Sequence, residues 1–425
     1  MRLCSGLLRE FATIYGMDFI IVEMASTATI AITITITVFG IVFCLMQTKY
    51  SRVSRSFAVF LGTVTVNNIP DAFHRFFEGA DNIYVQTAEL IIWTPSSLCV
   101  APLFWLYVFT LTSTEDGQPA RLFRHFVLPA FAVSIGLIAA LTSPDIGSAL
   151  AYDDAMIPTG WRLALISVIV LLHVSLYPQM AIYLYLILRR MMRYRLMLRD
   201  FYASTEEHEL RWIYVIGGLG GLYWLGRVLL LIFGFDPEQA DTFAVFLGFA
   251  GFCNLALIAA MTLWGLRQRP PLMPDTNDES PPEITEDIPP HQPSEKYEKS
   301  ALSPEASSRI ERKLRAAMEQ DHLHRDPNLS LWALARHTGA SSNYISQTLN
   351  EVVGESFFDF VNGYRISEAK ELLSTTNATV LTITYDVGFN ARSSFYNAFK
   401  RVTGQTPTSY RKTLSHRVGM DDVRG

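Results

Sequence analysis

The chain has 425 residues and a formal net charge of −5 at pH 7, and 50% of its residues are hydrophobic while only 18% are charged. Soluble proteins carry about 25% charged residues. This composition therefore argues against a single soluble globule, and the many apolar residues exclude a wholly disordered chain. The charge is also unevenly distributed, because residues 1–266 carry 35 charged side chains, residues 267–304 carry 12 and residues 305–425 carry 28. The chain thus divides into an apolar block, a short polar segment and a block with the charge of a soluble domain.

The apolar block contains runs long enough to cross a bilayer as helices, which takes about 20 residues. Six of these runs are Met24–Met46, Leu90–Thr112, Phe126–Ser143, Leu163–Leu188, Trp212–Phe235 and Thr242–Leu266. A seventh, Ser56–Pro70, is shorter and contains Asn67 and Asn68, so it is the weakest candidate. Residues 32–38 alternate as a strand would, but a lone strand in lipid leaves its backbone unpaired, so a helix is expected there. We predict an all-α bundle of seven transmembrane helices over residues 1–266.

Basic residues in the short loops predict the orientation of this bundle. With seven spans, the loops on one side carry thirteen Lys or Arg residues, whereas the other side carries Arg2, Arg9, Arg75 and Arg162. The asymmetry alternates correctly only if Ser56–Pro70 is counted as a span. The N-terminus is therefore predicted outside, and the C-terminal block in the cytoplasm.

Four polar side chains inside or at the edge of the predicted spans are candidates for a ligand or sensor site: Glu89, His173, Arg227 and Asn254. An ionisable group inside a membrane is costly and points to function. One interpretation is a pocket open to the outside, in which Arg227 holds an anion or pairs with Glu89. The alternative is hydrogen bonding that only holds the helices together. The four cysteines lack metal-ligand spacing, so we expect neither metal nor cofactor.

Residues 267–304 are rich in proline, and their acidic residues outnumber the basic ones eight to four. A segment with so few apolar residues is typical of an extended or disordered linker. We expect it to let the final block move free of the bilayer. A partner-binding motif is the alternative interpretation.

The C-terminal block reads as a series of short helices, the first over Glu305–Gln320. From Leu329 to Gly354, an apolar helix face, a turn at Gly339 and a candidate N-cap at Ser341 give the pattern of a helix-turn-helix. A longer helix from about Phe357 to Leu373 follows.

The helix-turn-helix pattern then repeats. Its turn lies at Gly388, and a second candidate recognition helix covers Asn390–Val402, with Phe395 and Phe399 facing inward at i, i+4. A short closing helix is expected after Thr406. Two such motifs joined by one long helix are therefore predicted.

This arrangement resembles the DNA-binding domain of the AraC/XylS family of bacterial transcription regulators over about residues 305–413, which leaves residues 414–425 as a tail. Its most specific part is the run ITYDVGFNARSSFYNAFKRVTGQTPTSYRK, residues 383–412. Thr384 stands where the family usually has Ala, which is expected to be tolerated if that helix face is partly solvated. The resemblance implies sequence-specific binding to double-stranded promoter DNA.

A recognition helix needs polar side chains facing the bases, and Arg and Asn can each form two hydrogen bonds with guanine and adenine respectively. By the family's arrangement, the base-reading positions are Asn343, Ser346 and Gln347 in the first motif and Arg392, Ser393 and Asn397 in the second. Candidates for phosphate contact are Lys400, Arg401, Arg411 and Lys412.

The charges of the two motifs differ. Residues 390–417 carry six basic residues and no acidic one, whereas residues 329–354 carry only Arg336 against Glu351. Phosphate attraction supplies much of DNA affinity. The second motif is therefore predicted to give most of the salt-dependent affinity.

The leading hypothesis is a one-component transcription regulator of the bacterial cytoplasmic membrane, in which the seven-helix block senses a signal and the cytoplasmic tail binds DNA. Its expected partners are DNA, the lipid bilayer, an unknown signal ligand or membrane partner, and a second copy of the chain in a homodimer. The alternative is a transporter or channel with a regulatory DNA-binding tail. A membrane enzyme is a third class, but the sequence has no His-rich metal cluster, nucleophile elbow or phosphate-binding glycine loop, so no catalytic residue is assigned.

Overall fold

The computed structural model describes residues 19–48, 50–76, 89–113, 121–142, 160–206, 208–233, 240–267 and 302–421. Every regular element in these ranges is helical. The chain divides into two compact units. The N-terminal unit holds Met1–Met191 and Leu210–Pro270, and the C-terminal unit holds Met192–Glu209 and Pro271–Gly425. Apart from its ends, the predicted linker 267–304 lies outside the described residues.

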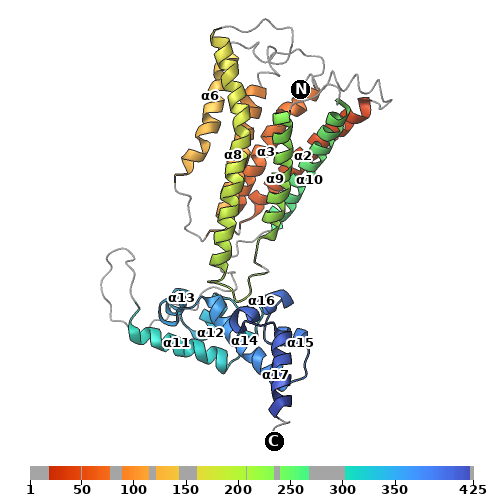
Figure 1. Ribbon diagram of the computed structural model, residues 1–425. Helices are drawn as coiled ribbons and strands as arrows, with labels where there is room; N and C mark the ends of the chain where they lie inside the picture. The colour runs from red at the N-terminus through yellow and green to blue at the C-terminus, as the bar shows by residue number, and fades with distance from the viewer. Residues whose placement is uncertain are drawn as a thin grey trace, which may run out of the picture. The chain divides into compact units, whose positions relative to one another are not determined.

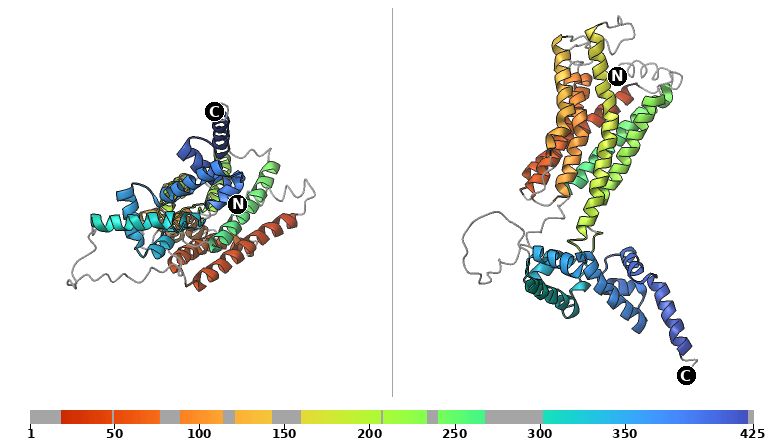
Figure 2. Two further views of the ribbon diagram at one scale, coloured as in Figure 1. Left: turned by 90° about the horizontal axis from the view of Figure 1, so that it is seen from below. Right: turned by 60° about the vertical axis from the view of Figure 1, so that its left-hand side comes forward.

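The N-terminal unit is built from helices that run roughly alongside one another in the right-hand view of Figure 2. In chain order they are α2 (Phe19–Met46), α3 (Ser51–Phe76), a π-helical turn at Glu89–Trp93 leading into α5 (Thr94–Leu111), a 3₁₀ turn at Leu122–Phe126 leading into α6 (Val127–Thr142), α8 (Trp161–Leu198), α9 (Arg211–Phe233) and α10 (Ala240–Arg267) (Figure 1). Residues 32–38 lie within α2, so the alternating run is helical, as predicted.

Five helices of the described residues are long and apolar enough to cross a membrane: Thr27–Met46, Leu90–Leu111, Leu122–Thr142, Trp161–Leu198 and Arg211–Leu229. Of the seven transmembrane helices predicted, five are therefore long and apolar enough in the described residues. Gly251–Arg267 in α10 is a shorter apolar helix. The difference at α3 has a physical reason, because this helix is less apolar and includes Arg52, Arg55, Asp71 and Arg75.

Helix α3 is stabilised by its neighbours rather than by its own apolarity, and it packs against both α2 and α5. Phe57 is buried, and its ring centroid lies 4.4 Å from that of Tyr107 on α5. Asn67 donates from Nδ2 to the hydroxyl oxygens of Ser96 at 3.0 Å and Ser97 at 2.7 Å. The polar side chain of Asn67 is thus satisfied inside the bundle, as buried polar groups usually are.

In the described residues of the C-terminal unit there are seven further helices, which Figure 1 also shows. They are α11 (Pro304–Glu319), α12 (Leu331–Thr338), α13 (Ser342–Thr348) extended by a π-helical turn at Leu349–Val353, α14 (Phe357–Thr375), α15 (Val380–Asp386), α16 (Arg392–Thr403) and α17 (Pro407–Asp421), with a 3₁₀ turn at Leu323–Arg325 after α11. The predicted helices are all present, and α17 is longer than the short closing helix expected.

Two hydrophobic cores share helix α14. Phe360 and Val361, in its first half, are buried with residues of α11, α12 and α13. Ile366, Ala369 and Leu373, in its second half, are buried with residues of α15 and α16. Helix α14 therefore joins the two helix-turn-helix motifs by contributing one face to each core.

Candidate nucleic-acid interface

The first helix-turn-helix motif consists of α12 and α13, joined through Gly339. This glycine has φ of 63°, in the left-handed region that glycine adopts without strain. The Oγ of Ser341 accepts a hydrogen bond from the backbone N–H of Tyr344 at 3.3 Å. Ser341 is therefore the N-cap of α13 that the sequence predicted.

The outward face of α13 carries the predicted base-reading residues of the first motif. Ile345 is buried beneath them. Asn343 is exposed, whereas Ser346 and Gln347 are half-buried. Gln347 donates from Nε2 to Glu351 Oε2 at 3.0 Å, so this side chain is held by an acidic neighbour.

The second motif consists of α15 and α16, joined by the turn at Gly388. This residue has φ of 94°, and a Cβ atom there would lie 2.5 Å from the carbonyl oxygen of His324. The turn therefore requires glycine both for its conformation and for the close approach of the backbone at His324. Phe389, Phe395 and Phe399 are buried behind it, as predicted for the two helix residues.

Thr384, on α15, lies in a fully buried position, so the condition of a partly solvated helix face, on which its tolerance was expected to depend, is not met. Its Oγ1 donates to the carbonyl oxygen of Val380 at 2.8 Å. The hydroxyl is thus satisfied within its own helix, which explains how Thr replaces Ala without access to solvent.

Helix α16 presents the predicted contact residues of the second motif on its exposed side. The exposed ones are Arg392, Ser393, Asn397, Lys400 and Arg401. Gly404, at φ of 74°, ends the helix. The candidate phosphate contacts on α17 differ, because Arg411 is half-buried while Lys412 is exposed.

Arg392 is positioned by its neighbour one turn along the helix. Its Nη2 donates to Tyr396 Oη at 3.1 Å, and its guanidinium carbon lies 4.8 Å from the centre of the Tyr396 ring. The hydrogen bond with Thr408, together with that from Arg392, holds the pKa of Tyr396 below its usual value despite partial burial. A side chain ordered in this way loses less rotamer freedom on binding a partner.

Arg401, by contrast, is paired with a carboxylate of the same unit. Its Nη2 donates to Asp359 Oδ1 on α14 at 2.7 Å. Its guanidinium carbon also lies 5.6 Å from the centre of the Phe358 ring. A phosphate approaching Arg401 would therefore compete with Asp359.

Arg365, on α14, is a fully buried residue that sequence reasoning placed on the joining helix without predicting its burial. Its Nε donates to the carbonyl oxygen of His324 at 2.6 Å and its Nη2 to that of Asp326 at 2.7 Å. Its guanidinium carbon lies 5.4 Å from the centre of the Phe389 ring. Burial lowers the pKa of Arg365 to about 10, so the side chain stays charged at neutral pH and links the two motifs.

Glu368, one turn further along α14, completes this junction. It accepts hydrogen bonds from Nε2 of His324 at 2.7 Å and Nε of Arg325 at 2.9 Å. Burial raises the pKa of Glu368, but the hydrogen bonds from Arg325 and His324 outweigh burial and hold the pKa below its usual value.

Among the candidate sensor residues, His173 on α8 makes contacts that join helices. Its Nδ1 lies 2.8 Å from the carbonyl oxygen of Ile169, and its Nε2 lies 3.4 Å from Oγ1 of Thr94. Its ring stacks on Trp93 with centroids 5.4 Å apart. These contacts agree with the structural interpretation of His173.

The other three candidates are not brought together with His173 by any described contact. Arg227 is half-buried on α9, and Asn254 is exposed on α10. Glu89 is the first residue of the π-helical turn, but its side chain lies outside the described residues.

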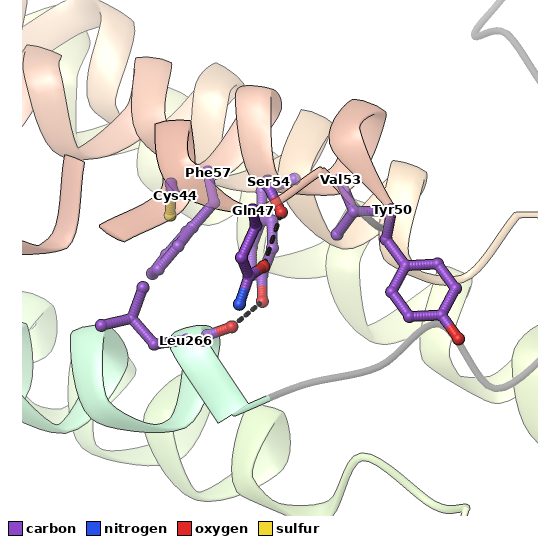
Figure 3. Close-up of a pocket in the computed structure, with 9 residues that line it drawn as sticks. Cys44, Gln47, Tyr50, Val53, Ser54, Phe57 and Leu266 are labelled. Atoms are coloured by element: carbon purple, nitrogen blue, oxygen red, sulfur yellow. Dashed lines mark hydrogen bonds between the residues drawn. The ribbon is translucent and has the colours of Figure 1, made fainter. Parts of the chain in front are cut away.

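A small cavity lies between α2, α3, α5 and α10 (Figure 3). Ser54 donates to Gln47 Oε1 at 2.8 Å, and Tyr107 donates to the carbonyl oxygen of Gly265 at 3.4 Å. The volume of this cavity is about 10 Å³, which is roughly the space of one water molecule. The cavity is therefore too small for a sensed ligand.

The helix-turn-helix domain family matches residues 334–413. Over 90 residues the chain is 39% identical to a helix-turn-helix-type transcriptional regulator of Staphylococcus aureus (strain COL), covering 21% of this chain and 12% of that protein. Over 98 residues it is 34% identical to the arabinose operon regulatory protein of Escherichia coli (strain K12), covering 23% of this chain and 33% of that protein. The matched part is thus a third or less of the length of these relatives.

Among solved structures, the C-terminal domain of AraT, a response regulator from Geobacillus stearothermophilus, matches 27% of this chain and 88% of its own, with 28% identity and a TM-score of 0.23. The family match begins within α12 and ends within α17, so it covers the two helix-turn-helix motifs with their turns at Gly339 and Gly388. The C-terminal part of this chain is therefore a helix-turn-helix domain of the AraC type.

Proposed function

We propose that this chain is a membrane-embedded one-component transcription regulator. Its AraC-type domain binds promoter DNA, and the N-terminal unit controls that binding in response to a signal. The observation that carries the proposal is the exposed side of α16, where Arg392, Ser393 and Asn397 lie over the buried Phe395 and Phe399. Polar side chains on a helix held by an apolar face are what a major groove requires.

The proposal that the N-terminal unit is embedded in lipid rests on its apolar surface. Large apolar side chains are more than half exposed on six of its described helices, for example Phe39 on α2, Leu141 on α6 and Leu171 on α8. Extended apolar surface of this kind is unfavourable in water, and lipid chains would cover it. We propose that α3 and α10 complete a seven-helix arrangement with the N-terminus outside the bacterial cytoplasmic membrane.

Two helix-turn-helix motifs in one domain can enter two successive major grooves. Pairing of two chains in a homodimer would raise the effective concentration of the second domain at a DNA site. The signal itself is a ligand or membrane partner of the N-terminal unit. Asn67 and His173, which bond across helices, are positions where such a signal could change the packing of the bundle.

Full-length protein in nanodiscs and promoter fragments from its own gene neighbourhood provide the test, with affinity measured as a function of salt. Arg392→Ala with Lys400→Ala is compared with Asn343→Ala with Gln347→Ala. We expect the α16 pair to lose more affinity, because a bidentate base contact is worth about 1–3 kcal/mol and Lys400 adds phosphate attraction. A larger loss from the α13 pair contradicts the assignment.

A further inference from the structure

The C-terminal unit includes a stretch of chain that precedes the AraC-type domain by about 100 residues. Helix α8 ends at Leu198, and residues Arg199–Ser204, here called the docking segment, fold against the domain. The carbonyl oxygen of Arg199 accepts from the backbone N–H of Phe358 at 2.9 Å, and that of Phe201 accepts from Leu331 at 2.8 Å. Phe358 and Leu331 lie in the first turns of α14 and α12, where backbone N–H groups have no partner within the helix.

The same segment completes the hydrophobic core of the first helix-turn-helix motif. Ala203 is 1% exposed and packs in one cluster with Leu329 and Leu331. Its backbone N–H donates to the carbonyl oxygen of Leu329 at 3.1 Å, next to an antiparallel bridge between Tyr202 and Ser330. The ring of Phe201 stacks on Trp332 with centroids 5.2 Å apart. The contact thus combines strand-like pairing with apolar burial.

Buried polar side chains of α14 bind the segment as well. Asn362 is 1% exposed and donates from Nδ2 to the carbonyl oxygen of Ala203 at 3.1 Å. Arg365 donates from Nη1 to Oγ of Ser204 at 3.1 Å. Burying an amide and a guanidinium is unfavourable unless their hydrogen bonds are made, and the segment supplies part of these hydrogen bonds.

Two routes lead from the docking segment to the recognition helix α16. The first passes through Asp359, whose Oδ1 lies 3.1 Å from Nη2 of Arg199 and 2.7 Å from Nη2 of Arg401 on α16. In the second, Arg365 joins Ser204 to the ring of Phe389, whose centroid lies 5.3 Å from that of Phe395 on α16.

We propose that Arg199–Ser204 is the docking element of the AraC-type domain and that its docked state supports DNA binding by α16. Taken with the proposed function on which it rests, this makes the end of α8 the connection between the sensing unit and the DNA-binding residues. The occupant of this surface is a segment of the same chain, covalently continuous with a candidate membrane helix.

The sign of the coupling follows from the shared carboxylate. While the segment is docked, Asp359 divides its charge between Arg199 and Arg401. When the segment leaves, Asp359 acts on Arg401 alone and holds it away from a phosphate. Departure also removes the Ser204 hydroxyl from Arg365. Both effects weaken the DNA-binding state, so docking and DNA binding favour each other.

The test uses the full chain in membranes, with a protease site inserted within residues 275–295. After cleavage, the N-terminal fragment carries the docking segment and the C-terminal fragment carries the AraC-type domain. We expect the C-terminal fragment to stay in the membrane pellet. Ala203→Glu places a charge in the buried contact and is expected to release it. The matched control is Thr205→Glu, which adds the same charge just beyond the docking segment and is expected to keep the fragment bound.

A cysteine pair tests the contact without placing a charge in the core. Tyr202→Cys with Ser330→Cys joins two positions of an antiparallel bridge, whose Cα separation suits a disulfide. Tyr202→Cys with Ser374→Cys is the control, because Ser374 lies near the far end of α14 from the segment. We expect the first pair, and not the second, to keep the two fragments joined on a non-reducing gel.

DNA affinity of the uncut protein tests the coupling. Ala203→Glu is expected to weaken binding by about fivefold or more, the lower end of typical coupling, and Thr205→Glu to leave it unchanged. Release of the C-terminal fragment from the unsubstituted protein, or no cross-link above the control pair, overturns the docking. Unchanged affinity of the released Ala203→Glu protein overturns the coupling. An N-terminal fragment missing from the membrane pellet overturns the proposed function instead.

Discussion

Arg401 on α16 and Asp359 on α14 form an ion pair with Nη2 and Oδ1 2.7 Å apart. The side chains are 47% and 37% exposed, so the pair contributes only about 0–1 kcal/mol to stability. Its importance lies in what else Arg401 can bind. A predicted phosphate-contact residue is held by a carboxylate of the helix that joins the two motifs, and DNA has to displace that carboxylate.

Asp359→Asn is therefore expected to strengthen DNA binding. It removes the charge that holds Arg401, so the affinity rises several-fold and the salt dependence steepens by about one released counterion. Glu371→Gln is the matched control, since it removes one acidic charge from an exposed position of the same helix. Salt titrations of the full-length proteins on one promoter fragment give both quantities. Equal behaviour of the two variants would exclude competition between Asp359 and phosphate.

Arg365→Met is expected to destabilise the C-terminal unit by about 3 kcal/mol or more. It leaves the carbonyl oxygens of His324 and Asp326 without their donor, and each buried unsatisfied group costs about 1–3 kcal/mol. Lys370→Met, at an exposed position of the same helix, is the control and changes stability by less than about 0.5 kcal/mol. Amide exchange of α14 in the full chain measures the difference, and equal protection in both variants argues against a central role for Arg365.

The turn of the second motif gives a sharp glycine prediction. Gly388→Ala places a Cβ in the left-handed region and within 2.5 Å of the His324 carbonyl oxygen, so it is expected to cost well above 1 kcal/mol. Gly363→Ala, within α14 and with open space around it, is expected to stabilise by about 0.5–1 kcal/mol. Thermal unfolding of the C-terminal unit should therefore shift in opposite directions. If the unfolding temperature shifts in the same direction in both variants, a side chain at Gly388 does not strain the turn.

The pH dependence of stability is expected to include a contribution from Glu368. Its pKa is lowered in the folded state by the hydrogen bonds from Arg325 and His324, which outweigh burial. A carboxyl group with a lowered pKa stabilises the fold above its unfolded pKa, near 4.3, and that stabilisation is lost as pH falls through the folded pKa. Glu368→Gln should thus reduce stability at pH 7 and approach the parent protein at acidic pH. Chemical unfolding at pH 7 and at about pH 2, well below the unfolded pKa, measures this. A constant difference between the two proteins contradicts it.

Much of the C-terminal fold could be predicted from the sequence, because its signals are local. Gly339 and Gly388 mark the turns, Ser341 caps α13, and the i, i+4 spacing of Phe395 and Phe399 identifies the buried face of α16. The burial of Arg365 had a signal too, since it lies four residues after Val361 and four before Ala369 on the buried side of α14. Because an arginine is usually exposed, this spacing alone does not predict that Arg365 is buried.

Other features had no local signal. The docking segment is separated by more than 120 residues from Leu331 and Phe358, and it lies between charged residues in a loop, so no periodicity connects it to the AraC-type domain. Helix α3 was the weakest predicted span because Asn67 and Asn68 interrupt its apolar run. Only the fold shows that Asn67 bonds to Ser96 and Ser97. Patterns in a single sequence do not predict contacts between segments that lie far apart along the chain.

The central claim, that a membrane-embedded chain regulates transcription through α16, is tested most directly by mapping the DNA bound by the intact protein across the genome of its native cell. We predict discrete promoter sites that share a sequence motif, whose occupancy is lost with Arg392→Ala while the protein remains in the membrane fraction. Binding at the same sites by the Arg392→Ala protein, or the absence of discrete sites for the unsubstituted protein, would contradict the account.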